Sequence, residues 1–313
     1  MENFDYIIVG AGSAGCVLAN RLSKNLNNKV LLIEAGGRDS YPWIHIPVGY
    51  YKTMHNPKTD WCYKTEPDET MENRSIPYPR GKTLGGSSSI NGLLYIRGQE
   101  QDYDIWSQLG NKGWSWNDVL PYFIKAENQE RGQDEFHGVG GPLSVSDQRI
   151  KLPILDAFMN AAEEVGIPKT DDFNDGNNEG SGYFEVNQKG GMRMSTSRAF
   201  LKPIMGRPNL RVLTQAHTTK ILFHDKRATG VAFDLKGTPS KANVSGEVIL
   251  SAGTVHSPKI LELSGIGRGE ILAQFDIPVN HELRGVGENL QDHLQIRTVF
   301  KVKNAVTLNQ KVN

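Results

Sequence analysis

The sequence of 313 residues is poor in cysteine, has no excess charge of either sign and contains no long apolar run. Its two cysteines, Cys16 and Cys62, belong to no CxxC pair and lie beside no histidines at metal-ligand spacing, so we expect neither a disulfide framework nor a metal site. The 35 basic residues balance the 35 acidic ones, which argues against nucleic acid as a partner because it is bound through basic surfaces. No stretch approaches the roughly 18 apolar residues of a membrane-spanning helix.

The start of the sequence does not resemble a secretory signal. In MENFDYIIVGAG, acidic residues occupy the positions where a signal carries basic ones, and the apolar run is short. Together with the scarcity of cysteine, this predicts a cytoplasmic protein. Attachment to the periphery of the inner membrane stays open.

The N-terminal residues predict a strand, a turn, a helix and a second strand. The apolar run at residues 6–9 ends at Gly10, apolar positions recur at helical spacing through residues 16–26, and a second apolar run follows at 29–33. Two strands joined by a helix form a parallel pair. The sequence therefore predicts an α/β fold with a doubly wound, Rossmann-type sheet.

Later segments predict further helices and strands. A helix is expected at 117–127 after the cap Asn117, and another at 153–165, which Gly166 ends. Four apolar segments, NLRVLTQA, TKILFHD, ATGVAFDLK and GEVILSAG, lie between turn residues and predict strands within 209–253.

A glycine-rich turn between the first strand and helix fits the dinucleotide-binding pattern GxGxxG. The residues expected to bind the cofactor there are Gly10, Gly12, Ser13, Ala14 and Gly15. Glu34, followed by Ala35, ends the second strand at the spacing where an acid accepts hydrogen bonds from the adenosine ribose. The helix N-terminus would meet the diphosphate. A glycine turn without a ligand is the alternative, and the pattern by itself does not choose between NAD and FAD.

Two longer motifs carry a family resemblance. Residues 80–104, RGKTLGGSSSINGLLYIRGQEQDYD, strongly resemble the first signature of the glucose–methanol–choline (GMC) oxidoreductases, and residues 253–267, GTVHSPKILELSGIG, resemble the second. DWCYKTEP at 60–67 and GVGENLQDH at 285–293 are also similar to family segments. The resemblance spans almost the whole chain and is greatest to bacterial choline and alcohol dehydrogenases.

The resemblance implies an FAD cofactor. Small residues in the first signature let the backbone approach a flat, bulky cofactor, whereas the alternative for GGSSS is a flexible surface linker. The further cofactor-binding residues that the resemblance implies are Trp61, Arg80, Gly81, Leu84, Gly85, Gly86, Ser87, Asn91, Gly92, Leu94, Thr218, Ala252 and Gly253. Some relatives attach FAD through a histidine just before the signature asparagine, and Ile90 stands there in this chain. We therefore expect FAD to be held without a covalent bond.

The resemblance also implies a division of the chain and a missing part. It implies a discontinuous FAD-binding domain at 1–35, 75–125 and 205–295, and a substrate-side segment with an antiparallel sheet at 130–200. Residues 296–313 would begin a truncated substrate domain. The catalytic residues of the family lie in a later segment, so the chain resembles an N-terminal fragment that is inactive by itself, and we assign no catalytic residue. His256 and His293 are the tempting substitutes, but isolated histidines are more often structural.

The implied activity is the oxidation of a primary alcohol or choline-like substrate to the aldehyde, with hydride passing to the flavin and electrons then to a quinone, a carrier or oxygen. Three alternatives stay open: a hydroxynitrile-lyase-like protein that uses FAD structurally, an FAD-binding protein without catalysis, and an NAD-dependent dehydrogenase. Reduction of the flavin by substrate would separate the first of these from an oxidoreductase. The two signatures give the last one no support.

Overall fold

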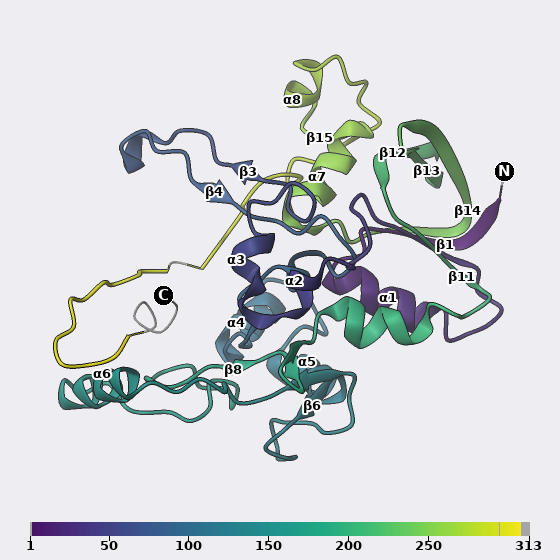
Figure 1. Cartoon of the computed structure of the whole chain (residues 1–313). Coiled ribbons are helices and arrows are strands. Elements are labelled where there is room, and N and C mark those ends of the chain that lie inside the picture. Colours follow the sequence, from purple (N-terminus) through teal and green to yellow (C-terminus); the bar gives the residue numbers. More distant parts are fainter. Residues whose placement is uncertain (1, 294, 308–313) are drawn as a thin grey trace. The chain divides into compact units, whose positions relative to one another are not determined.

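The computed structural model describes residues 2–293 and 295–307, and the chain forms two compact units (Figure 1). Unit 1 comprises residues 2–92 and 191–291. Unit 2 comprises residues 93–190 and the described residues from 292 onward. Residues 93–190 of unit 2 are therefore inserted into the sequence of unit 1, and its other residues follow unit 1.

A six-stranded sheet forms the centre of unit 1. Its strands, in spatial order, are β11 (Leu210–Leu213), β2 (Val30–Ile33), β1 (Asn3–Val9), β14 (Thr238–Leu250), β13 (Arg227–Leu235) and β12 (Ala216–His224). The first four are parallel. β14 joins two types of pairing, because its first half pairs antiparallel with β13 and its second half pairs parallel with β1.

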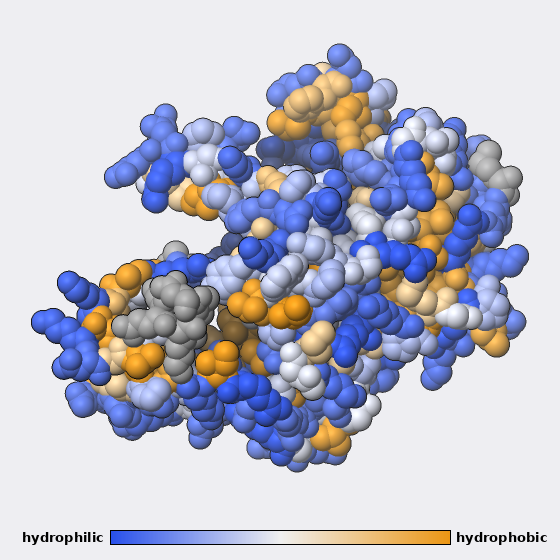
Figure 2. All heavy atoms as spheres, viewed as in Figure 1, coloured by the Kyte–Doolittle hydropathy of each residue, from blue (hydrophilic) through white to orange (hydrophobic). Residues whose placement is uncertain are grey.

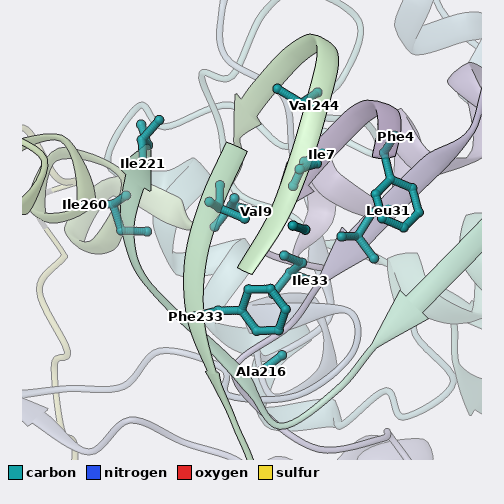
Figure 3. Packing of buried hydrophobic residues seen from close by; sticks show 12 residues of the cluster. Phe4, Ile7, Val9, Leu31, Ile33, Ala216, Ile221, Phe233, Val244 and Ile260 are labelled. Carbon is teal, nitrogen blue, oxygen red and sulfur yellow. The ribbon is translucent and has the colours of Figure 1, made fainter. Parts of the chain in front are cut away.

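Both faces of this sheet are covered. Ile7 of β1 packs in an apolar cluster with Ile260 of α7 (Gly253–Leu263), as Figure 3 shows. Ile8 is fully buried but lies outside that cluster, and alternation along a strand directs it to the opposite face. α1 (Ser13–Leu22) packs against β1 and β2. The sheet thus has the doubly wound, layered form that the sequence predicts.

The first helix differs from its prediction at both ends, since α1 begins at Ser13 and ends at Leu22 rather than covering 16–26. The side-chain amide of Asn209 donates to carbonyl oxygens of the following turn, those of Ser23, Asn25 and Asn28. These hydrogen bonds stabilise a turn directly after the helix and leave Leu26 67% exposed. Asn209 is distant in sequence, so no local pattern could indicate this end.

Unit 1 also contains short elements. Its other helices are α2 (Pro42–His45), α3 (Tyr50–Thr53), α8 (Gly269–Ala273), the 3₁₀ helices η1 (Pro47–Gly49), η2 (Glu69–Met71), η3 (Gly86–Ser89) and η5 (Lys202–Ile204), and the π-helix η4 (Ser197–Leu201). Its other strands are β3 (Tyr63–Lys64), β4 (Pro77–Tyr78), β10 (Met192–Arg193), β15 (Ile266–Gly267) and β16 (His281–Glu282). β3 and β4 pair as an antiparallel hairpin.

Unit 2 has three helices and several short strands among its described residues. The helices are α4 (Glu100–Gln108), α5 (Trp116–Ala126) and α6 (Pro153–Glu164). The strands are β5 (Leu94–Tyr95), β6 (Glu127–Gln129), β7 (Leu143–Val145), β8 (Glu185–Val186) and β9 (Gln188–Lys189). β5 and β8 pair antiparallel, the type of pairing expected on the substrate side, whereas β6 and β7 pair parallel.

The two helices predicted in this region are present, with one corrected start. α6 ends at Glu164 and is followed by Gly166 in the left-handed conformation, as predicted. The cap Asn117 is wrong, because the side chain of Ser115 caps α5 and Asp118 completes a capping box with it. Asn117 instead lies inside the first turn of the helix.

A buried network of charged side chains stabilises unit 2. Glu127 accepts a hydrogen bond from Arg97 at 3.0 Å and contacts Nδ1 of His137 at 3.1 Å. Nε2 of His137 lies 2.8 Å from Asp172. Burial alone would lower the pKa of His137, but its hydrogen bonds to Asp172 and Glu127 and their charges outweigh burial and raise this pKa to about 10. The ring is therefore protonated at neutral pH.

Apolar side chains are exposed around α6 (Figure 2). The most exposed of them are Ile150, Leu155, Phe158, Val165 and Ile167.

Within residues 2–293 and 295–307, no helix is both long and apolar enough to cross a membrane.

The stability of unit 2 should decrease as the pH rises above neutrality. The folded pKa of His137 lies near 10, above its ordinary value of 6.5. The stabilisation by the protonated ring is therefore fully present below pH 6.5 and is lost as the pH approaches 10. Between these values we expect the free energy of unfolding to fall by up to about 1.4 kcal/mol per pH unit.

Urea unfolding followed by tryptophan fluorescence measures this slope when Trp43 and Trp61 of unit 1 are replaced by Phe. The remaining tryptophans, Trp106, Trp114 and Trp116, then report on unit 2. His137→Gln should lower the stability and remove the slope, whereas the exposed His224→Gln should change neither. A slope that persists in His137→Gln would show that another group titrates.

Candidate functional site

The turn between β1 and α1 depends on glycine. Gly10 has φ +97°, and a Cβ there would lie 2.6 Å from the carbonyl oxygen of Ser251. Only a residue without a side chain fits both the conformation and the close approach of the chain after β14. Gly15 lies in the first half of α1 and is buried against this turn. The turn therefore brings the N-terminus of α1 close to the end of β14.

Glu34 connects the turn to the loop after β2. Its side chain is 6% exposed, and its two carboxylate oxygens accept from the backbone N–H groups of Ala11 at 2.9 Å and Gly36 at 2.8 Å. Burial raises the pKa of Glu34 to about 7, although both N–H groups and the charge of Lys82 act in the opposite direction. Each oxygen retains a lone pair that a ligand hydroxyl could use.

The first signature lies directly on the glycine turn. The N–H of Gly85 donates to the carbonyl oxygen of Ala11 at 2.8 Å. Gly86 has φ +53°, and a Cβ there would come within 2.7 Å of the Cα of Gly12. The side chain of Ser87 accepts from the N–H of Gly81 at 3.1 Å, which closes the loop. The glycine turn and the first signature, which lie near opposite ends of residues 2–92, are thus in direct contact.

A cavity of about 750 Å³ opens within unit 1 between these segments. The sequence-predicted residues that line it are Gly10, Gly12, Ser13, Ala14, Glu34, Ala35, Trp61, Arg80, Gly81, Gly86, Ser87, Thr218, Ala252 and Gly253. Residues predicted from the dinucleotide-binding motif and residues predicted from the family resemblance therefore surround one cavity.

Other predicted residues lie elsewhere. Gly15, Leu84 and Gly85 are buried behind the lining, and Gly92 is exposed with open space around its Cα. Asn91 is held by Arg193, whose guanidinium donates to its side-chain oxygen and to its carbonyl oxygen at 2.7 Å each. Leu94 begins β5 of unit 2.

The cavity also has lining residues that the sequence analysis did not assign to the cofactor, among them His256, which it considered only as a catalytic base. They are Val9, Ile33, Ala216, His217, Thr219, Leu250, Ser251, Thr254, Val255, His256, Ser257, Lys259, Ile260 and Leu263. Half of this set comes from α7, whose sequence was noted only as part of the second signature. The sequence pattern that could have predicted this role is that α7, like α1, directly follows a strand that ends in small residues.

Two observations fit a bound dinucleotide. Thr218 is 4% exposed, and its Oγ1 has no hydrogen-bond partner among the described residues, so a ligand can supply one. The backbones of Gly86 and Gly12 approach each other so closely that a side chain at Gly86 would occupy the space between them. No group of three or more His, Cys, Asp or Glu side chains in the described ranges could hold a metal ion.

The parallel βαβ unit, its glycine turn, the buried acid and the adjoining cavity define a dinucleotide-binding protein of the doubly wound α/β class. Comparison with known proteins gives the family. The model of the GMC oxidoreductases matches residues 4–295, and the chain belongs to this family.

Similar proteins of known name support this membership. The chain is 47% identical over 296 residues to an alcohol dehydrogenase [acceptor] of Pseudomonas putida, covering 94% of this chain and 54% of that protein. It is 44% identical to an oxygen-dependent choline dehydrogenase of Photobacterium profundum, covering 99% and 55%. A solved FAD-dependent oxidoreductase from Chaetomium thermophilum is similar with a TM-score of 0.86 and 34% identity, covering 93% and 52%. The chain thus spans about half the length of the curated relatives that it matches.

FAD binding should become tighter as the pH rises toward 7 and should level off above it. The raised pKa means that Glu34 is protonated below about pH 7 in the free chain. A carboxylate accepts more hydrogen bonds from ribose hydroxyls than a protonated carboxyl does, so binding favours loss of the proton. The affinity should therefore increase by up to about tenfold per pH unit below this pKa.

Titration of the chain with FAD, followed by flavin fluorescence, measures this dependence. At pH 8, Glu34→Gln should weaken binding by about tenfold, and it should abolish the pH dependence. The control Glu247→Gln removes an exposed carboxyl from the same sheet and should behave as the parent. An unchanged pH profile in Glu34→Gln would exclude Glu34 as the titrating group.

Proposed function

We propose that this chain is the FAD-binding part of an oxidoreductase that oxidises the CH–OH group of a primary alcohol or choline-like substrate to the aldehyde. The observation that carries the proposal is the cavity that the glycine turn, Glu34, the first signature and α7 form together. FAD, when bound, supplies the acceptor for hydride from the substrate carbon. The chain's own part is to bind FAD, to orient it and to shield it from water.

The lining residues suggest a role for each end of the cavity. Glu34 and Thr218 present a carboxylate and a buried hydroxyl suited to the adenosine half of FAD. The N-terminus of α1 offers backbone N–H groups to the diphosphate. Gly86 and Ser87 have little bulk and leave room for the part of FAD that continues toward the flavin. We propose that the other cofactor-binding residues predicted from the sequence also contribute to the FAD site.

The names of the relatives support the substrate class. They include an alcohol dehydrogenase that uses an acceptor and oxygen-dependent choline dehydrogenases, so we propose a small alcohol as substrate and a quinone, a carrier or oxygen as electron acceptor. A cytoplasmic location, with or without contact to the inner membrane, fits such an activity. We assign no catalytic residue within the described part of the chain.

We also propose that different segments of the sequence bind FAD and form the substrate side. Residues 1–35, 75–125 and 205–295 would serve FAD, 130–200 would serve the substrate side, and 296–313 would begin a further substrate-side segment. The two compact units are divided differently, since residues 93–125 lie in unit 2. A limited-proteolysis map of the FAD-loaded chain would show which segments FAD protects.

A substrate of the complete enzyme should bleach its flavin. The protein at its natural length is expressed and desalted, and choline and short primary alkanols are added without oxygen. We expect a yellow protein whose visible flavin absorption disappears as the aldehyde forms. The matched control is the corresponding tertiary alcohol, which has no hydrogen on the carbinol carbon and should leave the flavin oxidised.

The other outcomes contradict the proposal in distinct ways. A yellow protein that no alcohol bleaches, but that cleaves a hydroxynitrile, would be a lyase with structural FAD. A yellow protein with neither activity would be an FAD-binding protein without catalysis. A colourless protein that FAD does not restore would exclude the assigned cofactor.

The flavin should be held without a covalent bond. Ile90 precedes the signature asparagine, is 3% exposed and carries no nucleophilic atom. Acid precipitation of the yellow protein should therefore leave the flavin in the supernatant. Flavin that remains with the precipitate would contradict this expectation.

A further inference from the structure

The loop before β3 is fixed to the first signature at the edge of the cavity. Asp60 is 1% exposed, and its side chain accepts from the N–H groups of His55, Cys62 and Arg80. The N–H of Trp61 donates to the carbonyl oxygen of Arg80 at 2.9 Å. These bonds place the ring of Trp61 in the cavity lining.

Tyr63 begins β3 and reaches a helix that is far away in the sequence. Its hydroxyl lies 2.5 Å from Nε2 of His256 in the first half of α7. The ring of His256 contacts that of Trp61 at 4.3 Å between centroids, and the ring of Tyr63 is stacked on Trp61 at 5.9 Å. Trp61 and His256 line the cavity, but Tyr63 does not.

These aromatic side chains lie at the end of the cavity where Thr218 is buried. His217, the neighbour of Thr218, is 5.6 Å from Trp61 and 6.4 Å from His256 between ring centroids. The unpaired hydroxyl of Thr218 and the acid Glu34 make this the adenosine end under the proposed function. A purine presents a flat face that aromatic rings bind by stacking.

The hydrogen bond joins two uncharged groups over a wide pH range. Burial, Lys259, His217 and Lys82 lower the pKa of His256 to about 4. Burial and the charge of Asp60 raise the pKa of Tyr63 to about 12. Between these two pKa values both side chains are neutral, so the Tyr63 hydroxyl can donate to the unprotonated ring nitrogen of His256. The hydrogen bond therefore persists across this pH range.

We propose that Tyr63 is a positioning residue for FAD: through its hydrogen bond to His256 it holds Trp61 and His256 as a stacking wall for the adenine. This inference rests on the proposed function, because it takes FAD as the ligand. It adds a role for Tyr63 and His256, neither of which was assigned to the cofactor from the sequence. A neutral His256 with a lowered pKa is a stacking and hydrogen-bonding group here rather than a base.

The test uses Tyr63→Phe, which removes the hydroxyl and keeps the ring that stacks on Trp61. The Kd values of FAD and of ADP are measured with the flavin-free chain by calorimetry. Loss of one hydrogen bond should raise both values by the same factor, about three- to tenfold. The control Tyr51→Phe removes the hydroxyl of a tyrosine that is 68% exposed and outside the cavity, and it should leave both values unchanged.

A double-mutant cycle shows whether Tyr63 acts through His256. In a His256→Phe background, Tyr63→Phe should have no further effect on either Kd. His256→Gln removes the stacking ring but keeps an amide that can bond to the Tyr63 hydroxyl, so Tyr63→Phe should raise both Kd values further in that background. The melting temperatures of the flavin-free variants are compared with the parent, and a loss of stability alone would not make the effect of Tyr63→Phe depend on a hydrogen-bonding side chain at position 256.

Three results would overturn the inference. They are an unchanged Kd in Tyr63→Phe, additive effects of the two substitutions, and a loss of affinity for FAD without one for ADP. A parent chain that binds neither FAD nor ADP would overturn the proposed function as well. A parent that binds both, with an unaffected Tyr63→Phe, would overturn only the role of Tyr63.

Discussion

The peptide groups of Ala11 hold the site together. Its N–H donates to Glu34 and its carbonyl oxygen accepts from Gly85, so one residue of the glycine turn connects the end of β2 and the first signature. Both bonds are buried, and a buried backbone group that loses its partner costs about 1–3 kcal/mol. The cavity exists because three segments meet at this turn without side chains between them. Any change that displaces the turn therefore affects the acid and the signature together.

Local sequence patterns were sufficient to predict the elements of unit 1 whose apolar residues follow a regular spacing. The strand at 6–9, the turn at Gly10 and the strand that ends before Glu34 were predicted from apolar spacing and glycine, and the structure contains them. The end of α1 was not predictable, because Asn209 stabilises the turn after it from a distant part of the chain. The cap of α5 was predictable from local sequence, because Ser115 and Asp118 have the spacing of a capping box, and the prediction of Asn117 was wrong.

The parts of the site that depend on backbone conformation could be predicted from the sequence. Glycines and the acid Glu34 are identified by their spacing, and they lie around the cavity. The contribution of α7 and the bond between Tyr63 and His256 depend on which long-range neighbours meet, and neither has a period or a motif of its own. Asn91 shows the reverse case. It belongs to the signature, yet its side chain is used to bind Arg193.

The hydrogen bonds between Arg193 and Asn91 lie where residues 93–190 join unit 1. Arg193 is 1% exposed, and its guanidinium binds Asn91, Ser88 and Ile44, so it joins the point where the chain leaves unit 1 to the point where it returns. Residues 93–190 thus form a loop whose two ends are held together within unit 1. The entropy of closing such a loop grows only with the logarithm of its length. Segments of quite different size and sequence could be inserted there at little cost to unit 1, which would let the inserted segment diverge while unit 1 is retained.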